Sequence, residues 1–140
     1  MADRRILTYG GYFDRFFETL TKEEQEKVGY ALLLLKTQER LPTKWIKHIK
    51  DGLYELRIEY NSNTYRIFFT FDKGNIVVLF NCFQKKSQKT PKKEIELALT
   101  LKRAYYEEPH QAPREYDSKH QRCAPARRYL RAQEWRGGYK

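Results

Sequence analysis

The chain has 140 residues, the length of one domain with room for an appendage. Its 28 lysines and arginines exceed its 18 aspartates and glutamates, and the net charge of +10 favours a nucleic acid or another acidic partner over an ordinary metabolic substrate. Two cysteines without metal or disulfide spacing, and an N-terminus with neither signal peptide nor membrane span, predict a cytoplasmic protein with no structural disulfides.

The first predicted elements are a short edge strand over residues 6–9 and two helices. Apolar residues at helical spacing predict a helix over residues 12–20. Thr21 followed by Glu24 is a capping-box pattern, so a second helix begins there and runs to about Glu39. The two helices together predict an αα-hairpin.

Three strands follow the helices. Alternating apolar residues predict half-buried strands over residues 53–60 and 64–71. Residues 76–83 are apolar on both faces, as expected of a central strand. Turn-forming residues at 61–63 and 72–75 separate the three, which predicts an antiparallel meander.

The first turn of this meander fixes how two arginines face each other. The apolar faces of the two strands coincide only if the loop holds an even number of residues. A loop of Asn61 and Ser62 places Arg57 directly opposite Arg66, whereas a loop over 61–64 makes them diagonal neighbours. Like charges side by side are unfavourable, so either arrangement indicates a bound anion. The alternative is that Arg57 pairs with a carboxylate on a neighbouring strand.

A lysine-rich loop leads from the last strand into a C-terminal helix. Thr90 is a good N-cap, and Pro91 suits the first helical position. The helix dipole disfavours cations at this end, yet Lys92 and Lys93 occupy the first turn. Cations placed where a helix attracts anions predict an anion site, with RNA as the natural ligand. The alternative is a solvated helix face.

The C-terminal part differs in composition from the rest of the chain. Prolines at 109, 113 and 125 interrupt a stretch that is poor in aliphatic residues. We interpret residues 109–140 as a basic, flexible extension of a domain that spans residues 1–108. An incidental extension without function is the alternative.

Three blocks of this sequence resemble the RelE/ParE superfamily of bacterial toxins, and within it the HigB-like, phage-derived branch of type II toxin–antitoxin systems. The blocks are KHIKDGLYELRI at 47–58, YRIF at 65–68, and FQKK at 83–86 followed by TPKKEI at 90–95. The resemblance covers about residues 4–107. It implies an α+β, microbial-ribonuclease-like fold, in which the αα-hairpin packs on a small, mainly antiparallel sheet with a C-terminal helix.

The resemblance also implies a function. Such a toxin is an endoribonuclease that enters the ribosomal A site and promotes attack of an mRNA ribose 2′-OH on the adjacent phosphate, thereby inhibiting translation. The implied partners are mRNA on the ribosome and an antitoxin, usually a small helix-turn-helix protein in this branch. Neither a metal nor another cofactor is expected, since His48, His110 and His120 show no ligand spacing.

Cleavage by a 2′-OH needs a base, an acid, and cations that stabilise the phosphorane. In the family a strand arginine, matched by Arg66, and a basic residue at the end of the last strand, matched by Lys86, serve this chemistry. We expect catalytic roles for Arg57, Arg66, Lys86, Lys89 and His48, and RNA-binding roles for Lys47, Lys50, Lys85, Lys92 and Lys93.

The proton-transfer residues depart from the family pattern. Relatives use a C-terminal tyrosine, or histidines and an aspartate near the last strand, but residues 85–93 contain neither Tyr nor His. His48 or Lys89 is the remaining candidate base, because crowded lysines lower one another's pKa. His48 is also interpretable as a solvated or packed residue. Trp45 is interpretable as a base-stacking residue or, in preference, as packing beneath the helices.

Two other functions compete with mRNA cleavage. ParE-like relatives inhibit DNA gyrase with the same fold, so the chain is alternatively a non-catalytic inhibitor of a protein target. A degenerate toxin that binds RNA or ribosomes without cutting is consistent with the missing tyrosine.

Overall fold

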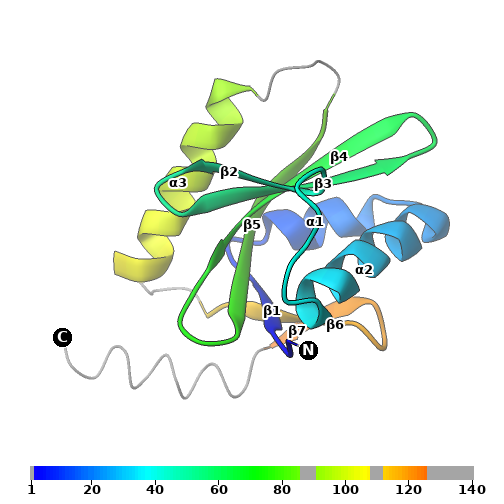
Figure 1. Ribbon diagram of the computed structural model, residues 1–140, viewed down its shortest axis with the longest axis horizontal. Coiled ribbons are helices and arrows are strands. Elements are labelled where there is room, and N and C mark those ends of the chain that lie inside the picture. The colour runs from blue at the N-terminus through cyan, green and yellow to red at the C-terminus, as the bar shows by residue number, and fades with distance from the viewer. Residues whose placement is uncertain (1, 86–90, 108–111, 126–140) are drawn as a thin grey trace.

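The computed structural model describes residues 2–85, 91–107 and 112–125. In these ranges the chain has an α+β fold, as predicted (Figure 1). Its elements are β1 (Arg5–Thr8), α1 (Tyr12–Glu18), α2 (Lys22–Thr37), β2 (Ile46–Lys50), β3 (Leu53–Tyr60), β4 (Asn63–Phe71), β5 (Ile76–Lys85), α3 (Lys92–Glu107), β6 (Arg114–Asp117) and β7 (Arg122–Pro125). No helix in the described ranges is both long and apolar enough to cross a membrane.

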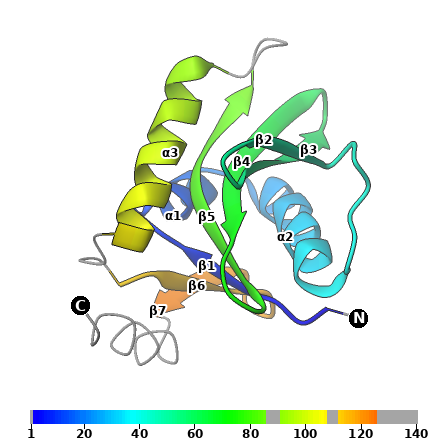
Figure 2. The ribbon, with the colours of Figure 1, turned by 60° about the vertical axis from the view of Figure 1, so that its left-hand side comes forward.

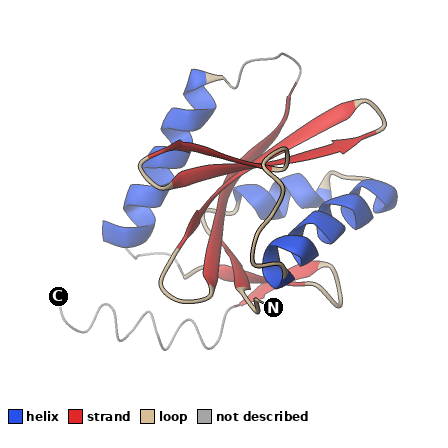
Figure 3. Cartoon of the chain, in the orientation of Figure 1, coloured by secondary structure: helices blue, strands red, loops and turns tan. Residues whose placement is uncertain are grey.

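The strands form one sheet in the order β2-β3-β4-β5-β1-β6-β7. Strand β1 runs parallel to β5, and the other neighbours are antiparallel. Helices α1 and α2 cover one face, and α3 covers the other (Figures 2 and 3). The sheet therefore has a core on each side, one built around Phe13, Leu32 and Ile67 and the other around Phe68 and Tyr105.

The predicted helical hairpin and meander are confirmed. Thr21 caps α2 through its hydroxyl, which accepts a bond from the Glu24 amide at 3.2 Å, while the Glu24 carboxylate accepts the Thr21 amide at 2.8 Å. In the β3–β4 turn, Asn61 and Ser62 both have positive φ, 49° and 66°. A two-residue turn of this kind matches the twist of paired strands, so it fixes their register. The shorter of the two predicted loops is therefore the one that forms.

Two predictions for the sheet are wrong. Strand β1 is an interior strand and not an edge strand, because β6 pairs with its second side. Residues 112–125, predicted to be part of a flexible extension, instead form the β6–β7 hairpin. Residues 108–111 and 126–140 lie outside the described residues, and the division of the chain at residue 108 stays a prediction.

Few contacts explain why this polar segment is ordered. Tyr116 is only 5% exposed, and its ring packs edge-on against Phe13 and Phe17 of α1. On the same strand as Tyr116, the Glu115 carboxylate accepts two hydrogen bonds, at 3.1 and 2.8 Å, from the Arg5 guanidinium of β1. An inward aromatic ring, this bidentate ion pair and a second ion pair, from Arg114 of β6 to Asp14 of α1 at 2.7 Å, hold the hairpin, although its composition is that of a loop.

Candidate functional site

The site is built around two arginines on neighbouring strands. Arg57 of β3 and Arg66 of β4 are direct partners in the strand register. Both donate to the same carboxylate oxygen of Glu55, Arg66 through Nη1 at 2.6 Å and Arg57 through Nε at 3.3 Å. Glu55 and Arg57 are two residues apart on one strand, so their side chains share a face. The carboxylate that pairs with Arg57 therefore belongs to its own strand. The alternative that we drew from the sequence was a carboxylate on a neighbouring strand.

Burial distinguishes the three members of this cluster. Glu55 is fully buried, Arg66 is 8% exposed, and the Arg57 side chain is one-third exposed. The buried Nε of Arg66 has no hydrogen-bond partner among the described residues. Two guanidinium groups share one carboxylate, so the cluster keeps a net positive charge. Glu55 therefore orients both guanidinium groups but neutralises the charge of only one. Planar guanidinium groups in this state suit phosphate oxygens.

Lys85 adds a third cation at the end of β5. It pairs with Thr64, two residues before Arg66 on the adjacent strand, and therefore lies on the same face as Arg66. Partial burial lowers the pKa of Lys85, the charge of Arg66 lowers it further, and Glu55 opposes the shift. Arg57 and Lys47 also lower this pKa. The cations are thus close enough to repel one another, which is the electrostatic state that a bound anion relieves.

Strand β2 contributes Lys47 to this face but not His48. Lys47 pairs with Glu55, whereas His48 pairs with Tyr54 and places its ring 5.1 Å from the Tyr54 ring, centroid to centroid. Tyr54 packs on the core under α1 and α2, so His48 lies on the opposite face from the arginines. The structure therefore does not bring His48 to the cluster. Lys50 is exposed beyond a bulge further along β2, where it pairs with Leu53.

The remaining predicted lysines fall into two groups. Lys92 and Lys93 are exposed at the start of α3, as their position in the sequence predicts. Asn81 of β5 ties this end of the helix to the sheet, because its amide donates to the Glu94 backbone and side chain, each at 3.0 Å. The other predicted residues of the loop, Lys86, Lys89 and Thr90, lie outside the described residues.

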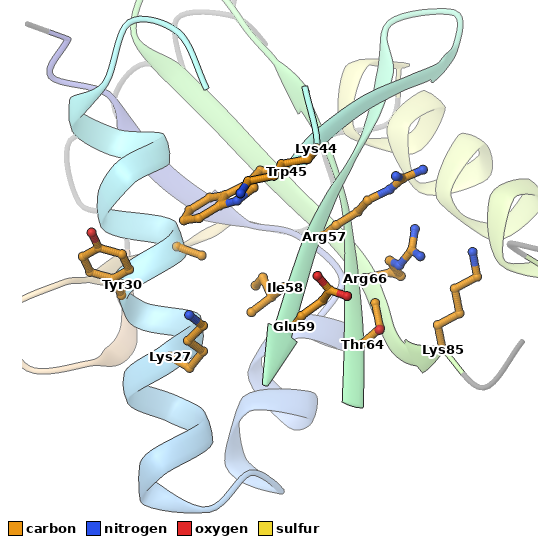
Figure 4. A pocket seen from close by; sticks show the side chains of 11 residues that line it. Lys27, Tyr30, Lys44, Trp45, Arg57, Ile58, Glu59, Thr64, Arg66 and Lys85 are labelled. Carbon is orange, nitrogen blue, oxygen red and sulfur yellow. The ribbon is translucent and has the colours of Figure 1, made fainter. Parts of the chain in front are cut away.

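A groove of about 780 Å³ extends from the arginines to α2 (Figure 4). Strand β2 pairs with β3 only as far as Leu56, and the last contact beyond it is the bond from the Arg57 amide to the Trp45 carbonyl, at 2.8 Å. The groove passes over the edge of β3 that is left uncovered. Its lining residues are Lys27, Tyr30, Ala31, Lys44, Trp45, Arg57, Ile58, Glu59, Thr64, Arg66 and Lys85.

Charge in the groove is strongly one-sided. Among the described lining residues five are lysines or arginines and one, Glu59, is acidic. The described part of the chain has no group of three His, Cys, Asp or Glu side chains that would hold a metal ion. The groove can therefore bind a polyanion and stabilise negative charge on a phosphate, with Arg57 and Arg66 as the best-placed donors.

Sequence reasoning missed Glu55 and the α2 side of the groove. Glu55 was detectable, since it shares a strand face with Arg57 and becomes a neighbour of Arg66 once the register is chosen. Lys27 of α2 and Lys44 had no comparable signal. Lys27 reaches the groove only through the packing of α2 against β3, which is a tertiary relationship, and Lys44 reaches it from the segment that leads into β2.

The fold and the groove together define an α+β domain with a positively charged groove at a sheet edge. Residues 15–103 match the family described as phage-derived protein Gp49-like (DUF891). The chain belongs to this family, and membership is consistent with a HigB-like toxin of the RelE/ParE superfamily. The matched range contains the described side chains of the groove and ends before the β6–β7 hairpin. No curated protein matches the chain.

Proposed function

We propose that this protein is the toxin of a type II toxin–antitoxin system and cleaves ribosome-bound mRNA. Family membership supports the toxin assignment, and the shared carboxylate of Arg57 and Arg66 supports the chemistry. In the proposed reaction, a ribose 2′-OH attacks the adjacent phosphate, and the two guanidinium groups stabilise the phosphorane. No step needs a metal. The proposed partners are mRNA in the ribosomal A site and a small helix-turn-helix antitoxin.

The arginine pair is the single observation that carries this proposal. Arg66 is rigid because its guanidinium is buried against Glu55, while Arg57 is open enough to meet a phosphate from solvent. Lys85 supplies further positive charge at the same place. Glu55 is a positioning residue, since it acts through the arginines. Lys89 stays the predicted general base, and Lys86 stays a predicted further cation. We no longer propose His48 for proton transfer.

A second candidate function is RNA or ribosome binding without cleavage. The described lining of the groove contains no histidine, the commonest proton-transfer residue in enzymes. One experiment separates the candidates: the chain is induced in bacterial cells, and mRNA 5′ ends are mapped. Cuts at fixed codon positions, absent in Arg66→Ala, support the nuclease.

Matched controls make this result specific to the groove. Lys73→Ala removes an exposed cation from the β4–β5 turn, at the far end of the strand from Arg66, and we expect cutting to persist. Growth arrest with uncut mRNA supports the binding toxin. Arrest accompanied by DNA damage supports an inhibitor of gyrase, and absence of arrest contradicts the toxin assignment.

A further inference from the structure

The groove has a second half that the proposed chemistry does not use. On the α2 side of β3 it is lined by Tyr30, Lys27, Lys44 and Trp45, across the strand from the arginines (Figure 4). Tyr30 is 53% exposed, and Trp45 is half-buried with its backbone fixed by the bond from Arg57. Two aromatic rings and two cations therefore face a space that is continuous with the space around Arg57 and Arg66.

This combination is chemically specific. A surface that binds only phosphates needs cations, and aromatic rings add nothing to that contact. Proteins that bind single-stranded nucleic acids combine a positively charged groove with aromatic side chains on which bases stack. An acidic peptide would match the charge but has no flat base to place on the indole of Trp45. The observed mixture of rings and cations favours single-stranded RNA.

We propose that the α2 side of the groove is a subsite for a nucleotide next to the one whose phosphate Arg57 and Arg66 hold. Trp45 stacks the base, Tyr30 provides a second stacking surface, and Lys27 and Lys44 contact the backbone phosphates. This inference rests on the proposed RNA substrate of the groove and adds how the strand is positioned. Such a subsite would orient the scissile bond from one side of β3 while the arginines act on the other.

Trp45 fluorescence tests the subsite directly in the full-length chain. Trp135 is the second tryptophan of the sequence, so the Trp135→Phe background makes Trp45 the sole tryptophan emitter. The probes are a short 2′-O-methyl RNA, which lacks the attacking hydroxyl, an abasic ribose-phosphate oligomer of equal length, and polyglutamate. We expect the RNA to quench Trp45 and to bind roughly 5- to 150-fold more tightly than the abasic oligomer.

Variants separate stacking from folding. Trp45→Ala should abolish the preference for the RNA over the abasic oligomer, as measured by titration with end-labelled oligomers, whereas Trp45→Phe should retain most of it. Tyr30→Ala removes an exposed ring and should reduce the preference without altering the thermal midpoint. Lys27→Ala and Lys44→Ala should each weaken both oligomers and lower the salt slope by about 0.7.

Three outcomes overturn the subsite: equal affinity for the RNA and the abasic oligomer, absence of quenching at low salt, or polyglutamate binding as tightly as the RNA. The last would identify the groove as a surface for an acidic protein. The 5′-end mapping is independent of this test. Cutting without Trp45 quenching would reject the subsite and keep the nuclease. Quenching without cutting would keep the subsite and reject the nuclease.

Discussion

Arg57 and Arg66 face each other across β3 and β4, and both donate to one oxygen of Glu55, a carboxylate with no exposed surface. This arrangement reconciles two requirements. The buried charge of Arg66 has a partner, as stability demands, and the pair keeps an excess positive charge for a ligand. The arginines are neither independent surface cations nor each locked to a separate acid.

Glu55 is the first position that we expect to affect both stability and function. Glu55→Ala leaves the guanidinium of Arg66 buried without its carboxylate, which should cost roughly 3–5 kcal/mol in the free energy of unfolding. Urea denaturation measures this. Glu59→Ala removes an exposed acid from the same strand and should change stability by less than about 0.5 kcal/mol. A loss below about 1 kcal/mol in Glu55→Ala would show that the arginines do not depend on it.

Lys85 should make RNA affinity sensitive to alkaline pH. Because its pKa is lowered, Lys85 loses its proton below the ordinary lysine pKa of 10.5, so binding should weaken as pH approaches that value. Arginine keeps its charge in this pH range, so Lys85→Arg should remove the decline in RNA affinity. The control Lys73→Arg should leave the decline unchanged. Titration of the 2′-O-methyl RNA across pH measures it. We expect roughly a fivefold effect, and an identical pH profile in Lys85→Arg would exclude Lys85 from the site.

Tyr65 and Glu24 link β4 to the start of α2 and should make stability depend on pH at both extremes. The Tyr65 hydroxyl donates to the Glu24 carboxylate and lowers the Glu24 pKa below its ordinary value of 4.5. Stabilisation from Glu24 is therefore present above pH 4.5 and is lost as pH falls through the lowered pKa. Burial is the main cause that raises the pKa of Tyr65 to about 12, so its contribution is lost as pH rises above 10.

Tyr65→Phe tests this linkage. We expect it to lower the free energy of unfolding by about 1 kcal/mol at neutral pH, since the hydrogen bond is removed while the ring remains. The difference from the wild type should shrink below pH 4.5 and above pH 10. Tyr60→Phe, on the neighbouring strand, is the control. A difference that is constant across pH would mean that the two groups are not coupled.

The β3–β4 turn predicts a stabilising substitution. Ser62 has a φ of 66°, which is unfavourable for any residue with a Cβ atom. Ser62→Gly should therefore raise the free energy of unfolding by about 1 kcal/mol. Gly74, in the next turn, has a φ of 63° with open space around it, so Gly74→Ala should be destabilising by a similar amount through backbone strain alone. Thermal denaturation of both variants checks the paired signs.

Tyr116 should be the main anchor of the β6–β7 hairpin. Tyr116→Ala removes the ring that packs on Phe13 and Phe17 and should cost about 3 kcal/mol, measured by denaturation of the full chain. Arg122→Ala changes an exposed residue of β7 and should cost less than about 0.5 kcal/mol. Equal stability of the two variants would mean that the hairpin contributes nothing to the core.

Local patterns in the sequence were sufficient for the elements that carry the arginines. Alternating apolar residues locate β3 and β4, and the requirement that their apolar faces coincide limits their register to two choices, one of which is observed. The position of Lys85 at the end of the last strand can also be predicted from residues that are neighbours in the sequence. These features depend on residues that are close along the chain, so they are readable without the tertiary structure.

Other parts of the site depend on contacts that no local pattern encodes. His48 belongs to β2, a strand that was not predicted from the sequence, and the pairing of β2 with β3 directs Lys47 and His48 to opposite faces. Lys27 reaches the groove from a helix that is distant in sequence. Similarly, the order in residues 112–125 comes from Tyr116 meeting α1, which composition alone does not reveal.

The β6–β7 hairpin also determines what the sheet exposes to other molecules. With β6 in place, Leu7 and Thr8 of β1 are paired on their second side, and the four-residue strand β7 forms the boundary. A chain cut after α3, at Glu107, would lose β6 and β7, end its sheet at β1 and offer an unpaired edge to a second copy. Shortened versions of this protein should therefore self-associate. In the full-length chain, β6 and β7 would thus protect the sheet against edge-to-edge aggregation.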